Sequence, residues 1–149
     1  MMSESNQLST PRALDQPVAD AIFSVMTEGY EFAKKGETAV AGSRMQQAWD
    51  MIPEPKLGWD ISTIAVLLIA KFYRSIGDYT KAHEWADRFL TLEHLPGDGA
   101  PFILKGSIYY EAGDLAAARE WLKKGLEVGR RRAFSGEDPK YLRLVTEPR

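Results

Sequence analysis

The feature that most constrains the fold is a phrase that occurs twice. Residues 77–85 read Gly-Asp-Tyr-Thr-Lys-Ala-His-Glu-Trp, and residues 113–121, which begin 36 positions later, read Gly-Asp-Leu-Ala-Ala-Ala-Arg-Glu-Trp. Gly, Asp, Ala, Glu and Trp recur at identical offsets, and an aromatic residue (Tyr73 or Tyr109) precedes each glycine by four positions. A repeat of this length, with helical spacing on both sides of a glycine turn, predicts a stack of helix pairs.

Apolar spacing places the helices, and glycine, proline and aspartate end or begin them. Helices are expected over residues 17–35, 38–52, 61–76, 79–92, 101–112 and 115–130, with a short last helix near 138–145. Helix 61–76 is apolar on most sides and is therefore expected to be the most buried. Gly36, Gly77 and Gly113 are expected at the turns, and Asp60, Asp78 and Asp114 at helix N-termini as capping residues.

These helices predict an all-α chain with one folded domain over residues 17–147. It contains three repeats at about 17–53, 60–94 and 99–130, and a C-terminal capping helix over 138–146 covers the apolar face that the last repeat would otherwise expose. Residues 1–16 are polar and are expected to be a disordered tail.

Four sets of positions recur in each helix pair. A small residue is followed by an aromatic, then by the turn glycine and by a second small residue: Gly29, Ala70 and Gly106; Phe32, Tyr73 and Tyr109; Gly36, Gly77 and Gly113; Ala41, Ala82 and Ala118. In this order, and in Pro53 after the first pair, the chain resembles the tetratricopeptide repeat (TPR) family, over about residues 18–130. The resemblance implies an α-solenoid of three repeats. Lys105 and Gly125 depart from it, because the family usually has Leu and Ala there.

The resemblance also implies a function, since members of this family mostly bind proteins in a concave groove lined by the first helix of each pair. The corresponding groove residues are Phe23, Met26, Tyr30, Lys34, Leu67, Lys71, Arg74, Ile103, Ser107, Tyr110 and Glu111. Leu67 and Ile103 also fit core positions, and Lys71 and Arg74 also fit a solvated helix face. Trp59, at the end of a proline-flanked loop, is a further candidate contact, or it covers the start of the next helix.

The chaperone-binding members of the family hold a peptide carboxylate with charged and amide side chains. The matching positions here are Met26, Tyr30, Leu68, Ala100 and Leu104, and none is charged. A helix or a folded surface is therefore a better partner for this groove than a charged peptide terminus.

No constellation of residues predicts catalysis. The chain has no cysteine, and its two histidines, His83 and His94, lie 11 positions apart near opposite ends of one predicted helix. Ser24, Ser43 and Ser107 do not lie in a nucleophile-elbow motif. The glycines mostly mark helix ends, and their spacing does not match a phosphate-binding loop. The sequence therefore predicts no catalytic residue, no metal site, no cofactor and no small-molecule substrate.

Charge is distributed unevenly along the chain. The formal net charge is −2, but residues 119–149 hold 9 Lys/Arg against 5 Asp/Glu. Lys123, Lys124 and Arg130 to Arg132 form either a solvated helix end or a docking patch for an acidic partner or RNA. The longest apolar run, Ile64 to Ala70, is far shorter than the roughly 20 residues of a membrane helix, so a cytoplasmic location without membrane contact is expected.

Together these features predict a non-enzymatic protein-binding module. The chain resembles short stand-alone bacterial TPR proteins, some of which are encoded beside secreted toxins, and this likeness implies an immunity protein that covers a cognate toxin. A secretion chaperone, a regulatory adaptor and an RNA-associated protein using the basic C-terminal region stay open as alternatives, as do a monomeric and a dimeric state.

Overall fold

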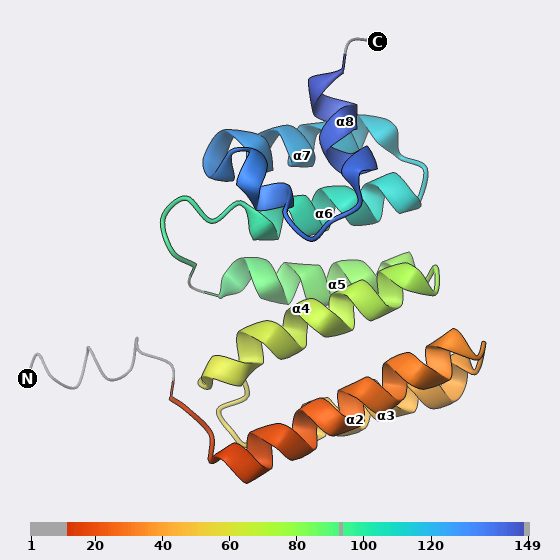
Figure 1. Cartoon of the computed structure of the whole chain (residues 1–149), viewed down its shortest axis with the longest axis vertical. Coiled ribbons are helices and arrows are strands. Elements are labelled where there is room, and N and C mark those ends of the chain that lie inside the picture. Colours follow the sequence, from red (N-terminus) through yellow and green to blue (C-terminus); the bar gives the residue numbers. More distant parts are fainter. Residues whose placement is uncertain (1–11, 93, 148–149) are drawn as a thin grey trace, which may run out of the picture. The chain divides into compact units, whose positions relative to one another are not determined.

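The protein is all-helical in the residues that its computed structural model describes, 12–92 and 94–147. In these residues the chain forms seven α-helices, one short 3₁₀ helix and no β-strand (Figure 1). The elements are α2 (Gln16–Lys34), α3 (Thr38–Asp50), α4 (Asp60–Ser75), α5 (Tyr79–Thr91), α6 (Ala100–Glu111), α7 (Leu115–Gly129), η1 (Arg131–Phe134) and α8 (Pro139–Thr146). The predicted all-α class is confirmed. Each α-helix begins and ends within two residues of its expected range, whereas η1 was not expected.

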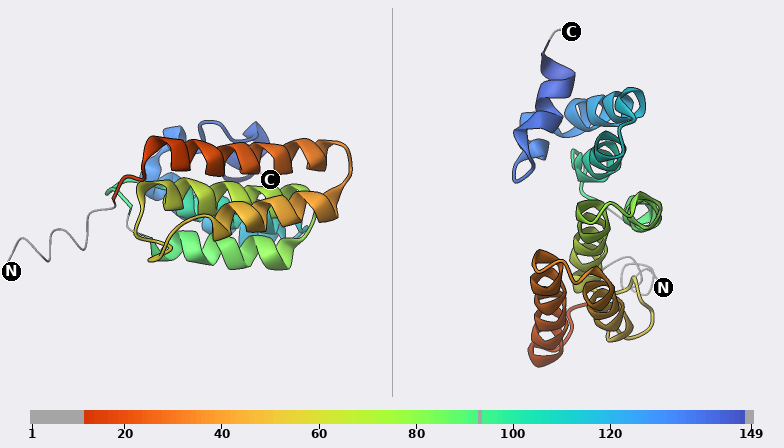
Figure 2. Two further views of the ribbon diagram at one scale, coloured as in Figure 1. Left: turned by 90° about the horizontal axis from the view of Figure 1, so that it is seen from below. Right: turned by 90° about the vertical axis from the view of Figure 1, so that its right-hand side faces the viewer.

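Two compact units, residues 1–69 and 70–149, make up the chain, and the boundary between them falls inside α4. In the first unit, α2 and α3 lie side by side (Figure 2). Their close approach depends on small residues. A Cβ atom on Gly29 would lie 2.9 Å from Met45 Cε and 3.3 Å from the Ala41 carbonyl oxygen, and Ala41 itself is fully buried.

The second unit contains the pair formed by α6 and α7, and α5 packs against α6. Here a Cβ atom on Gly106 would lie 2.6 Å from Leu122 Cγ, so this glycine is required at the helix crossing. Ala82 and Ala118 are fully buried, as expected of residues that let helices approach closely. Gly125 has the same role, because the Ile103 side chain fills the space that a Cβ atom would need. Neighbouring helices are thus packed in pairs, while the regular stacking of three TPR-like repeats stays a prediction.

The turns have the predicted chemistry. Gly36, Gly77 and Gly113 have φ angles of 81°, 80° and 89°, in the left-handed region that favours glycine. Asp78 Oδ1 accepts a hydrogen bond from the Lys81 backbone N–H (3.2 Å), and Asp114 Oδ1 accepts one from Ala117 (3.1 Å). These bonds satisfy N–H groups that have no partner within their helix. Asp60, in contrast, is the first residue of α4 rather than a residue preceding it.

The C-terminal segment covers the apolar face of the last helix pair. Phe134 of η1 and Tyr141 of α8 are 6% and 4% exposed and belong to one core cluster with Ile103, Ala118 and Leu122. Both α8 and η1 contact α6 and α7. This packing matches the covering role expected of a last helix, and it places Ile103 in the core instead of in a groove. The predicted tail lies largely outside the described residues.

Candidate protein-binding face

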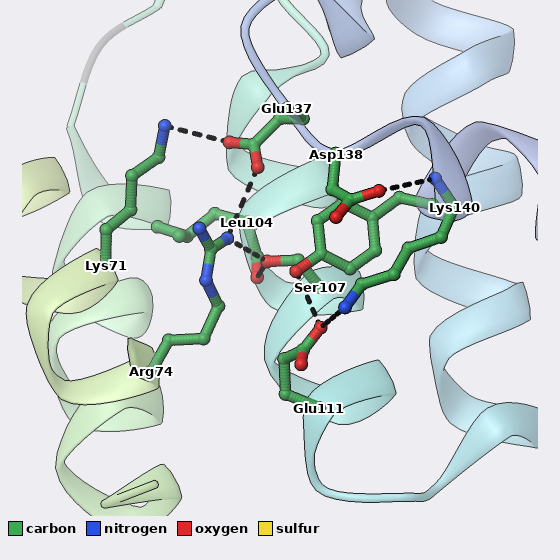
Figure 3. A network of polar contacts seen from close by, with 9 residues as sticks. Lys71, Arg74, Leu104, Ser107, Glu111, Glu137, Asp138 and Lys140 are labelled. Atoms are coloured by element: carbon green, nitrogen blue, oxygen red, sulfur yellow. Dashed lines mark hydrogen bonds and ion pairs between the residues drawn. The ribbon is translucent and has the colours of Figure 1, made fainter. Parts of the chain in front are cut away.

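Five of the predicted contact residues lie together in the second unit. Lys71 and Arg74 occupy the last turns of α4, three positions apart, and Ser107, Tyr110 and Glu111 are three and four positions apart on α6. Residues at these spacings share one side of a helix. Figure 3 shows that Lys71 and Arg74 from α4, and Ser107 and Glu111 from α6, point toward the same polar network. We call these five residues the α4–α6 face.

Glu137, in the turn between η1 and α8, binds both cations of this face. Its Oε1 atom is 2.8 Å from Lys71 Nζ, and its Oε2 atom is 3.4 Å from Arg74 Nη1 (Figure 3). Arg74 Nη1 also donates a 2.7 Å hydrogen bond to Ser107 Oγ, and Ser107 donates one of 2.7 Å to the Leu104 carbonyl. Ser107 therefore fixes the direction in which the guanidinium points.

A second set of contacts joins α8 to α6. Tyr141 donates a 2.8 Å hydrogen bond from its hydroxyl to Glu111 Oε2, which also lies 2.9 Å from Lys140 Nζ. The Tyr141 ring meets the Tyr110 ring edge-on, with 5.3 Å between centroids, and the Arg74 guanidinium carbon lies 5.7 Å from the Tyr141 ring centroid. The C-terminal segment, residues 134–141, thus contacts the face through charged, polar and aromatic groups.

These contacts shift the pKa values of the groups that make them. Burial alone would raise the pKa of Glu111, but the hydrogen bonds from Lys140 and Tyr141 outweigh it and lower that pKa. The bond to Glu111 raises the pKa of Lys140. The pKa of the Tyr141 phenol is raised, first by burial, and its bond to Glu111 adds to this effect against the opposing charge of Arg74. Glu111 and Lys140 are therefore both held in their charged forms.

The structure corrects how open this face was expected to be. Ser107 is fully buried, and the side chains of Arg74 and Lys71 are 16% and 28% exposed. Lys71 and Arg74 are neither free groove residues nor freely solvated ones, because the protein's own Glu137 pairs with them. The sequence did not predict that a segment more than 60 residues further along the chain would reach α4.

In the first unit, the predicted contact residues differ in exposure. Met26 is 1% exposed and lies in the core, so it offers a partner almost no surface. Phe23 and Leu67 are half-buried. Tyr30 donates a 2.6 Å hydrogen bond from its hydroxyl to the Leu68 carbonyl, which ties α2 to α4 within this unit. Lys34 is exposed and forms an ion pair with Glu31 within its own helix (3.2 Å).

The loop that carries Trp59 is held by internal bonds. The Trp59 indole Nε1 donates to the Pro53 carbonyl (2.9 Å), and its backbone neighbours Gly58 and Asp60 bond to Arg12. Lys56 Nζ donates to the carbonyls of Trp49 (2.9 Å) and Ile52 (2.7 Å). This ammonium therefore bonds carbonyls at and just after the C-terminal end of α3. The half-buried Trp59 belongs to a fixed turn.

A buried lysine was noted in the sequence only as a departure from the family pattern. Lys105 is 6% exposed, and its Nζ atom lies 2.9 Å from Asp87 Oδ1 and 3.0 Å from His83 Nδ1. The rings of Tyr109 and Trp121 lie 5.5 and 5.6 Å away. Burial, and then the Lys105 charge, lower the pKa of His83. The signal in the sequence was the separation of His83 and Asp87 by four positions, because residues at this spacing lie on the same side of a helix.

The basic C-terminal cluster is exposed. The exposed cations are Lys123 and Lys124 within α7, Arg130 at its C-cap, and Arg131 and Arg132 in η1. Among residues 12–92 and 94–147, no group of three or more His, Cys, Asp or Glu side chains is placed to hold a metal ion. None of the described helices is both long enough and apolar enough to span a membrane.

Neither protein-family models nor curated proteins give a match to this chain. The class that the structure defines is therefore an all-helical protein of packed helix pairs.

Proposed function

We propose that this protein is a non-enzymatic module that binds a partner protein through the α4–α6 face. The observation that carries the proposal is that this face already binds a polypeptide, the C-terminal segment of the chain itself. It offers two cations, a carboxylate and a tyrosine ring within one unit. Such a mixture of aromatic and charged groups is typical of protein contact surfaces. Tyrosine and arginine are enriched among the residues that contribute most to the binding free energy.

Within this function, an immunity protein that neutralises a cognate bacterial toxin is the role we favour. It rests on the resemblance to short stand-alone TPR proteins, and its alternatives are a secretion chaperone and a regulatory adaptor. A toxin gene beside the gene for this chain supports immunity, whereas a secretion-apparatus gene in that place supports a chaperone.

The test is capture of a partner by the tagged full-length chain from an extract of its native cell, followed by identification of the bound protein. Arg74→Gln removes a charge from the face, and Tyr110→Ala removes its aromatic ring. We expect both variants to lose most of the partner while their circular dichroism shows a folded protein. Arg131→Gln, which removes an exposed charge outside the face, is the matched control and should capture the partner normally.

If both face variants still capture the partner and Arg131→Gln does not, the basic cluster is the binding site. That cluster also supports a second candidate function, RNA binding, because its five cations in α7, at its C-cap and in η1 are all exposed. RNA binding predicts an electrophoretic shift whose affinity falls steeply between low and moderate salt, since phosphate contacts release counterions. An affinity that does not depend on salt would exclude this candidate.

A further inference from the structure

We propose that Lys71 and Arg74 form a carboxylate-binding site for an acidic side chain of the partner, and that Glu137 occupies this site in the isolated chain. The inference rests on the proposed function and names the chemistry by which the partner is recognised: a glutamate or aspartate on an exposed turn or helix. Ser107 is a positioning residue in this site, because it holds Arg74 and does not touch the carboxylate.

The geometry of the site is that of a two-cation receptor. One oxygen of Glu137 meets the Lys71 ammonium at 2.8 Å and the other meets the Arg74 guanidinium at 3.4 Å. The Glu137 side chain is only 10% exposed, so the carboxylate is largely withdrawn from water. Charge-assisted bonds of this kind are roughly twice as strong as neutral ones. A neutral group in the same place would leave two neighbouring cations without compensation.

Glu137 lies in a short turn between two residues that are anchored in the core, Phe134 and Tyr141. The turn around Glu137 contains Gly136, with a φ of 82°, and its neighbours Ser135 and Asp138 are exposed. The following helix, α8, has eight residues and buries one of them, Tyr141, and so short a helix has little stability of its own.

The start of the segment is also strained. Arg130 has φ 61° and ψ −168°, a conformation that favours glycine over residues with a side chain.

The partner must supply a carboxylate to replace the one that leaves. While Glu137 is attached to the same chain, it competes at an effective concentration of about millimolar for a short connection. An acidic ligand added in solution should therefore bind the wild-type chain weakly. It should bind more tightly once the internal carboxylate has been replaced.

The experiment is an NMR titration of the full-length chain with a peptide of residues 134–140, Phe-Ser-Gly-Glu-Asp-Pro-Lys, observing the Arg74 Nε–H signal. We expect Glu137→Gln to bind this peptide at least about tenfold more tightly than the wild type does, because the internal competitor is gone. A peptide with Gln in place of its Glu should bind Glu137→Gln more weakly than the parent peptide. The double variant Glu137→Gln with Arg74→Gln, which lacks the Arg74 side chain and is followed by the backbone amide signal of Ser107, should lose the preference for the acidic peptide.

A second variant keeps the test valid if Glu137→Gln is poorly folded. Glu137→Asp retains the charge on a shorter side chain and should have an affinity for the peptide between those of Glu137→Gln and the wild type. Two results overturn the carboxylate site. One is an equal affinity of all three chains for the peptide. The other is that the Arg74 signal does not shift in any of these chains up to about 10 mM peptide, which is well above the effective concentration of the internal carboxylate. If partner capture nevertheless depends on Arg74 and Tyr110, the proposed function stands without this site. If the peptide binds as expected and no partner is captured, the proposed function fails while the site stands.

Discussion

The α6–α7 crossing gives the sharpest stability prediction, because two known effects of opposite sign compete at Gly106. Replacing a helical glycine with alanine stabilises a helix by about 1 kcal/mol. At Gly106, however, the new Cβ atom would lie 2.6 and 2.8 Å from Leu122 Cγ and Cδ2, and 3.0 Å from the Leu122 backbone nitrogen. The side chain can rotate but the backbone of α7 must move, and overpacking of this kind costs about 1–3 kcal/mol.

We therefore expect Gly106→Ala to lower the free energy of unfolding by about 1 kcal/mol net, because the overpacking term exceeds the gain in helix propensity. Urea denaturation followed by circular dichroism measures this change. Leu122→Ala removes the two nearest carbon atoms, so adding Gly106→Ala to that background should be less harmful than adding it to the wild type. If Gly106→Ala alone stabilises the protein by the full helix-propensity gain, the close crossing described here is wrong.

Three further predictions concern the interior of the second unit. Ala118→Trp should lower stability by about 1–3 kcal/mol through overpacking of a fully buried position, and an unchanged melting midpoint would contradict that packing. Lys105→Leu should change stability little or raise it, because desolvating the ammonium offsets much of its attraction to Asp87, whereas Lys105→Ala should melt at a lower temperature than Lys105→Leu does. Folding lowers the pKa of His83 from its usual value of 6.5. At a pH just below 6.5, the unfolded chain therefore binds more protons than the folded chain does. Stability should therefore fall as the pH decreases through that value, and His83→Gln should show a shallower decline in thermal melts at several pH values.

The helices could be predicted because their signals are local. Glycines with positive φ, aspartate caps at Asp78 and Asp114, and apolar residues at helical spacing act within a few positions of the chain. The close crossings were predictable from the small residues Ala82 and Ala118 for the same reason. In contrast, η1 depends on a backbone conformation at Arg130 that non-glycine residues rarely adopt, and no pattern in the sequence indicates it.

The candidate face was predicted only in part. The resemblance to the TPR family grouped Lys71 with Arg74, and Ser107 with Tyr110 and Glu111, and the structure places the two groups on α4 and α6. The resemblance did not show what covers them, because Glu137 and Tyr141 reach the face through tertiary packing of a distant segment. The burial of Met26 and Ser107 depends in the same way on neighbouring helices. Lys105 shows the converse case, in which a departure from an expected pattern marks a buried network of charges and rings.

The account depends most directly on the contact between Glu137 and Arg74, and a double-mutant cycle measures it. Glu137→Gln, Arg74→Gln and the double variant are compared with the wild type by urea denaturation, with Glu127→Gln, an exposed carboxylate on α7, as the control for loss of one negative charge. Because both partners are largely buried, we predict a favourable coupling free energy of about 1–2 kcal/mol, in the range of charge-assisted hydrogen bonds and directly contacting residues. A coupling indistinguishable from zero, with effects of Glu137→Gln no larger than those of Glu127→Gln, would contradict the claim that the C-terminal segment occupies the α4–α6 face.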